Sequence, residues 1–99
     1  MDHLEHLRGL TPHARLHAVR LLAVHRDLIV TSGFRSPERN RAVGGKPRSY
    51  HLTGRAIDVV SSRARLEDAA RTASAQRVSA RCTGPEEVVM EDDHLHLAW

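Results

Sequence analysis

The sequence has few of the residues on which several common classes of small domain depend. Cys82 is the single cysteine in 99 residues, so an intrachain disulfide cannot form and a cysteine-rich zinc finger is excluded. Aromatic residues make up 3% of the chain, so aliphatic side chains and alanine must supply the core. Because few rings are present to stack on bases, and no DNA- or RNA-binding motif is recognisable, we expect no nucleic-acid partner.

Long apolar runs are also absent. No stretch approaches the roughly 18 apolar residues of a transmembrane helix, so we expect no insertion into a membrane. Residues 1–10 contain acids and histidines and no continuous apolar segment, which does not fit a secretory signal peptide. We therefore expect synthesis in the cytoplasm. We also expect a single domain over residues 1–99, because a core of this size leaves nothing for a second one.

The chain is instead rich in arginine and histidine. Its formal net charge is +3, and Lys46 is the sole lysine. A basic surface favours an anionic partner such as nucleic acid, anionic lipid or cell-wall polymer. The eight histidines are unusual for this length, and histidine is the commonest metal ligand, so their positions need examination.

Capping signals and periodicity predict three helices. Thr11-Pro12 begins a helix over residues 12–26, Ser36-Pro37 begins a short helix over about 37–43, and Ser61 or Ser62 caps a third helix. The predicted buried residues of the first helix are Leu16, Val19, Leu22 and Ala23. Those of the third helix are Leu66, Ala69, Ala70 and Ala73.

Four short runs predict strands, at residues 28–31, 56–60, 88–90 and 95–97. Residues 44–54 predict a loop and residues 83–85 a turn, from their glycine and proline. We expect the last two strands to pair as a hairpin across residues 91–93. Helices and strands are mixed with short connections, which indicates an α+β fold with helices packed on one face of a small, mainly antiparallel sheet.

A group of polar residues is expected where the central loop meets the strands. His51 lies in that loop, and strand alternation puts Asp58 on the face opposite its apolar neighbours. A carboxylate in the middle of a strand is costly to bury unless it is paired or bound to a metal. His94 and His96 lie two residues apart on one face of the last strand. Together these residues could supply two imidazoles and one carboxylate, the ligand set of an open catalytic zinc site.

Three acids precede this histidine pair. Any of Glu91, Asp92 and Asp93 could act as a base beside the metal. If the last strand begins at Asp92, alternation places Asp92 on the face of His94 and His96 and turns Asp93 away. A turn or bulge just before His94 is needed to bring Asp93 to that face instead.

In this order and spacing, the residues resemble a known family. The string Ser49-x-His51-x-x-Gly54-x-Ala56-x-Asp58, followed by an acid and by His94-x-His96, is similar to the zinc D-Ala-D-Ala metallopeptidases. So is the upstream string SGFRSP at residues 32–37, with Asn40 and Gly44-Gly45 after it. The similarity extends from about residue 29 to residue 98. It implies a hedgehog/D-Ala-D-Ala-peptidase-like fold, shared with lysostaphin-type domains.

The resemblance also implies roles for particular residues. One zinc ion would be held by His51, Asp58 and His96. Asp93, three residues before His96, would be the general base and later the acid. Arg35 would contact the substrate and stabilise negative charge on the scissile carbonyl oxygen.

Two further residues receive roles from the same resemblance. Ser49 would bind the substrate, and His94 would line the site or orient a group there. The nearby acid and Arg35 favour an enzyme over a purely structural zinc site, which needs neither.

The activity implied by the resemblance is hydrolysis of amide bonds in peptidoglycan stem peptides by metal-activated water. A D-Ala-D-Ala carboxypeptidase is the expected type. The alternatives are an L-Ala-D-Glu endopeptidase of the phage endolysin type and a non-catalytic zinc-binding module of the same fold. The expected partners are stem peptides or muropeptides, met at the cell wall by a phage lysis or virion protein or recycled in the bacterial cytoplasm. The sequence indicates no oligomeric state.

Overall fold

The computed structural model describes residues 3–78, 85 and 87–99 of the chain. The three predicted helices are present, and α1 ends at Val24 rather than at residue 26. In chain order the described elements are the 3-10 helix η1 (His3–Leu7), α1 (Pro12–Val24), β1 (Ile29–Ser32), α2 (Pro37–Ala42), the 3-10 helix η2 (Tyr50–Thr53), β2 (Ala56–Val60), α3 (Arg63–Val78), β3 (Glu87–Met90) and β4 (Leu95–Ala98).

The predicted caps form at the helix starts. Thr11 Oγ1 accepts a hydrogen bond from Ala14 N at 3.2 Å, and Ser36 Oγ accepts one from Arg39 N at 3.1 Å. Each satisfies a backbone donor that the first turn of a helix leaves free. The predicted loop over residues 44–54 is wrong in part, because η2 forms within it.

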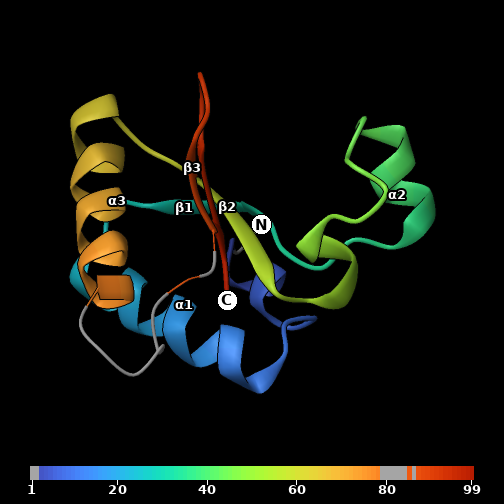
Figure 1. Ribbon diagram of the computed structural model, residues 1–99, viewed down its shortest axis with the longest axis horizontal. Helices are drawn as coiled ribbons and strands as arrows, with labels where there is room; N and C mark the ends of the chain where they lie inside the picture. Colours follow the sequence, from blue (N-terminus) through green and yellow to red (C-terminus); the bar gives the residue numbers. More distant parts are fainter. Residues whose placement is uncertain (1–2, 79–84, 86) are drawn as a thin grey trace.

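The strands form one antiparallel sheet in the order β1-β2-β4-β3 (Figure 1). The predicted hairpin is confirmed, because β3 pairs with β4. In the centre of the sheet, Asp58 pairs with Ser32 on one side and with His96 on the other. Paired residues of an antiparallel ladder project to the same face, so this register places three polar side chains in one row.

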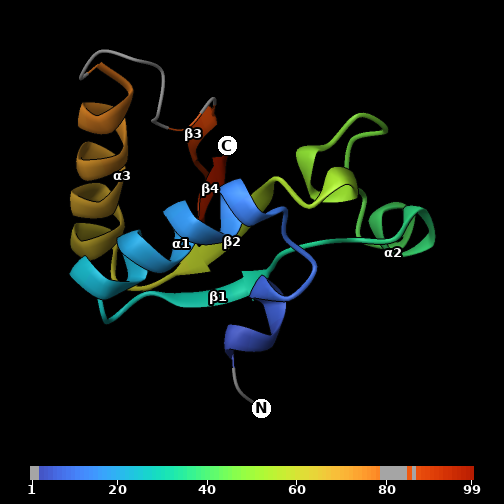
Figure 2. The same ribbon diagram turned by 90° about the horizontal axis from the view of Figure 1, so that it is seen from below.

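The opposite face of the sheet belongs to the hydrophobic core. Residues of α1 and α3 pack there against the inward residues of the strands, and α1 lies across β1 and β2 (Figure 2). α2 lies at the other end of the long axis from α3 (Figure 1). The core residues of β1, β2 and β4 are Val30, Ile57, Val59, Leu95 and Leu97. The predicted α+β class with a small antiparallel sheet is confirmed.

The predicted buried stripe of α1 is wrong in most positions. Leu16 and Val19 are each 49% exposed, Ala23 is exposed, and of the predicted residues Leu22 alone packs against the core. The buried residues are Ala14, Ala18 and Leu21. The face that carries these two alanines and Leu21 packs in the core, so Leu16 and Val19 are turned toward solvent. In α3 the prediction is largely confirmed, since Leu66, Ala69 and Ala73 are buried and Ala70 packs against the core.

A glycine fixes the connection from η2 to β2. Gly54 has φ +69°, and a Cβ there would lie 2.4 Å from Gly9 O. Only glycine combines a left-handed backbone with this close approach at low cost. The turn predicted at residues 83–85 lies outside the described residues, apart from Pro85, which is buried. Among the described helices, none has the length and apolar character required to span a bilayer.

Candidate metal centre

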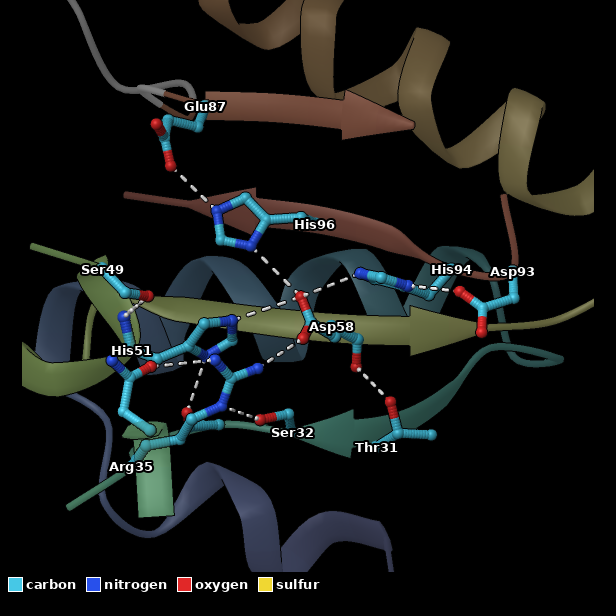
Figure 3. Close-up of polar contacts among 12 residues, drawn as sticks. Thr31, Ser32, Arg35, Ser49, His51, Asp58, Glu87, Asp93, His94 and His96 are labelled. Carbon is cyan, nitrogen blue, oxygen red and sulfur yellow. Dashed lines mark hydrogen bonds and ion pairs between the residues drawn. The ribbon is translucent and has the colours of Figure 1, made fainter. Parts of the chain in front are cut away.

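The polar row at the centre of the sheet is built around one buried carboxylate (Figure 3). Asp58 is 7% exposed and projects from β2 toward side chains of η2, β4 and the segment after β1. Figure 3 shows three histidines and an arginine converging on its two oxygens. A buried carboxylate requires such partners, because burial without them is strongly unfavourable.

His51 reaches Asp58 from η2. The hydroxyl of Ser49 accepts a hydrogen bond from His51 N at 3.2 Å and so begins this short helix. The ring is 2% exposed, and its Nδ1 donates to the carbonyl oxygen of Gly33 at 2.8 Å. This bond orients the ring so that the other nitrogen, Nε2, faces Asp58, and Nε2 lies 3.2 Å from Asp58 Oδ1.

His96 reaches the same oxygen from the neighbouring strand. Its Nδ1 lies 3.1 Å from Asp58 Oδ1, and its Nε2 donates to Glu87 Oε1 at 2.8 Å. Sequence reasoning missed Glu87. The signal that could have found it is the hairpin register, since Val89 pairs with His96 and Glu87 lies two residues away on the same face of β3.

The charges around Asp58 shift two pKa values in opposite directions. Burial acts to raise the pKa of Asp58, but hydrogen bonds from His51 and His96 outweigh it and hold that pKa well below its usual range. Burial acts to lower the pKa of His96, but its bonds to Asp58 and Glu87 outweigh it and raise that pKa above 6.5. The site therefore favours a carboxylate at its centre and a cation around it.

The donor set fits zinc. One ligand atom from each of His51, Asp58 and His96 lies within 4.8 Å of the others. Ligand atoms of a tetrahedral zinc ion lie about 3.3 Å apart, which is close to the two nitrogen–oxygen distances measured here. Each imidazole also donates its other nitrogen to an oxygen acceptor, the arrangement that fixes tautomer and ring orientation in metal sites. The structure thus brings together the three residues predicted as ligands.

Arg35 adjoins the centre from the segment after β1. Its Nη2 donates to Asp58 Oδ2 at 2.9 Å, its Nε to Ser32 Oγ at 3.0 Å and its Nη1 to Asn40 Oδ1 at 3.2 Å. All three nitrogens of the guanidinium are thus engaged. The contact with Asp58 was not foreseen in the sequence, where Arg35 was expected to act on the substrate.

The acidic cluster before β4 is bent rather than extended. A bend at residues 92–93 precedes the strand, so strand alternation does not continue back to Asp92. Asp93 Oδ1 lies 2.7 Å from His94 Nδ1, and this contact lowers the pKa of Asp93. The other ring nitrogen of His94 faces the centre, 3.8 Å from Asp58 Oδ1. Glu91, by contrast, lines the cavity itself.

A cavity of about 330 Å³ opens over these residues. The segment of residues 44–50, which includes Ser49, contributes one part of its lining. The β3–β4 hairpin contributes another part, and Arg35 and the three predicted ligands line it as well. A site with a fixed donor set, a buried charge and an open cavity can bind a small molecule next to a metal.

Comparison with known proteins gives one family. The family described as Peptidase M15 matches residues 10–98. No curated protein and no solved structure matches the chain. The matched segment contains every residue of the metal centre and of the cavity lining.

Proposed function

The chain belongs to the peptidase M15 family, and from this premise we propose that it is a zinc peptidase that hydrolyses amide bonds in peptidoglycan stem peptides. The type we propose is a D-Ala-D-Ala carboxypeptidase. The observation that carries the proposal is the convergence of His51 Nε2 and His96 Nδ1 on Asp58 beside an open cavity. Its expected substrates are stem peptides or muropeptides, at the wall or released from it.

His51, Asp58 and His96 would hold the metal. A zinc ion with three protein ligands makes a water molecule acidic enough to act as a nucleophile near neutral pH and polarises a carbonyl. The protein contributes the ligand geometry, which Gly33 O and Glu87 keep in place by accepting the outer ring hydrogens.

Asp93 and His94 would move the proton. Asp93 holds Nδ1 of His94, so that Nε2 is directed toward the centre. The low pKa of Asp93 keeps it ionised, and an ionised partner stabilises the imidazolium that forms when His94 takes a proton. In this assignment His94 takes the proton and returns it to the leaving amine, while Asp93 stays ionised and supports it; direct proton transfer to Asp93, the role that the resemblance implies, is the alternative. Glu91 is the alternative base, since it lines the cavity.

Arg35 and Ser49 would bind the substrate. Arg35 lines the cavity, and its positive charge stabilises the negative charge that develops on a carbonyl oxygen during attack. Ser49 Oγ accepts from the backbone of His51, so its hydroxyl hydrogen is available to donate to a substrate carbonyl.

Mass spectrometry of purified muropeptides treated with the zinc-loaded protein tests the proposal. Loss of the terminal D-alanine is the expected result. Cleavage between L-Ala and D-Glu would instead indicate the endopeptidase. Bound zinc with no bond cut would indicate a non-catalytic zinc-binding module and would overturn the enzymatic proposal.

A further inference from the structure

Two cations of the segment after α2 line the cavity without an ion-pair partner. Lys46 and Arg48 are exposed, and neither forms an ion pair with any residue that the structure describes. Arg35, the other cation of the lining, donates to Asp58. The cations of the lining that no carboxylate among the described residues pairs with are therefore Lys46 and Arg48.

The backbone beneath these two cations is held by a buried amide. Asn40 is 4% exposed, and its Nδ2 donates to Lys46 O at 2.8 Å, while Ser49 N donates to the same oxygen at 3.1 Å. A Cβ at Gly45 would lie 2.0 Å from Asn40 Oδ1, so the segment packs directly against this side chain. The same Oδ1 accepts from Arg35. One amide thus fixes the cation-bearing segment relative to the metal centre.

The β3–β4 hairpin adds two negative charges to the lining. Glu87 and Glu91 come from the β3–β4 hairpin, and Glu87 accepts from His96. These carboxylates repel an anionic group, and the two free cations attract it. An anionic ligand that enters the cavity is therefore oriented with its negative group toward Lys46 and Arg48.

We propose that Lys46 and Arg48 form a carboxylate subsite that selects peptide acids for this centre. The inference rests on the proposed function, because it names the part of the substrate that the site recognises. In a stem peptide whose third residue is lysine, the carboxylate has two sources, the C-terminus and the free carboxyl group of the D-glutamate residue. Lys46 and Arg48 can each make a charge-assisted contact with either carboxylate. Conversion of that carboxylate to an amide removes both contacts.

Equilibrium binding to the metal-free protein tests the subsite without hydrolysis. The probe is a synthetic stem pentapeptide ending in D-Ala-D-Ala, titrated by calorimetry as the acid, as its C-terminal amide and as its D-glutamate amide. We expect K46Q/R48Q to bind the acid about tenfold more weakly than the wild type. If the C-terminal amide binds equally weakly to the wild type and to K46Q/R48Q, the subsite binds the C-terminal carboxylate. If the D-glutamate amide does so, the subsite binds the D-glutamate carboxylate.

A matched variant controls for loss of net charge. R39Q/R41Q removes the same two charges from α2, outside the cavity lining, and should bind the acid as the wild type does. Circular dichroism melting of both variants checks that they fold. The subsite is overturned if the two double variants bind alike, if the wild type does not distinguish the acid from either amide, or if it binds none of the three.

Turnover of the zinc-loaded protein separates this inference from the proposed function. The subsite predicts a raised KM and an unchanged kcat for K46Q/R48Q. Muropeptide cleavage with a KM that these substitutions do not change would overturn the subsite and support the enzyme. Acid binding that depends on both cations, with no bond cut, would support the subsite and overturn the enzyme.

Discussion

Replacement of Glu87 by glutamine tests whether the residues around the ligands tune the metal centre. Glu87 Oε1 accepts from His96 Nε2 at 2.8 Å, and this bond directs Nδ1 of the ring toward Asp58. Glutamine keeps an acceptor of similar shape and removes the negative charge. The change therefore weakens the bond and makes the imidazole a poorer donor to a metal, while the fold is retained.

The expected loss follows from this geometry. Removal of such an outer partner costs roughly 10- to 100-fold in metal affinity. The Glu87 side chain is 43% exposed, so water replaces part of the interaction, and we expect a loss near the lower limit. A tenfold loss corresponds to about 1.4 kcal/mol of binding free energy. Alanine at this position removes the acceptor as well and should cost more.

Competition between the protein and a chromogenic chelator for zinc measures this loss. E91Q is the matched control. It removes the same charge from the cavity lining, and the hydrogen bonds of His96 to described side chains are with Asp58 and Glu87, not with Glu91. We expect E91Q to bind zinc almost as the wild type does. Equal zinc affinities for E87Q and E91Q would refute the assignment of Glu87 as a positioning residue.

Three further outcomes follow from the same contacts. Asp93→Asn should retain stoichiometric zinc and lose about 100-fold or more in kcat, measured as muropeptide turnover together with metal content, and loss of the metal would contradict a role in proton transfer. In the metal-free protein, the raised pKa of His96 gives a stabilisation that is complete below the ordinary value of 6.5 and is lost as pH rises through the raised value, so urea unfolding at a series of pH values should show a decline there. Leu97→Ala should cost about 2–5 kcal/mol of unfolding free energy, because Leu97 is fully buried in the core. Leu16→Ala, at a half-exposed position, should cost about 0.5 kcal/mol or less, and a similar loss in both variants would contradict the core described here.

Local sequence patterns predicted most of the elements and the position of the site. A cap needs only a hydroxyl and a backbone amide three residues later, so Thr11 and Ser36 mark their helices without reference to the rest of the fold. Strand alternation is also local, and it placed Asp58 on the polar face. These signals act over a few residues, which is why they can be read from one sequence.

The remainder depends on contacts between distant segments. The bond from Glu87 to His96 requires the register of β3 against β4, and the bond from Arg35 to Asp58 requires the path of the chain after β1. The face of α1 was mistaken for a similar reason. Both faces of this helix carry apolar residues, and only its packing against distant segments decides that Ala18 rather than Leu16 is buried.

The two faces of the sheet separate stability from chemistry, and this has a measurable consequence for metal binding. The core lies on the face of α1 and α3 and includes none of the three ligands, so the fold does not need the metal to close its core.

On the other face, Asp58 and Glu87 favour a proton on His96. That proton must leave when His96 binds zinc. Zinc binding at a pH below the raised pKa of His96 should therefore release about one proton from this residue, and the release should diminish as pH rises above it. Calorimetric titrations in buffers of different ionisation enthalpy measure this number, and release that does not change across the pKa of His96 would contradict the assignment of this residue as a ligand.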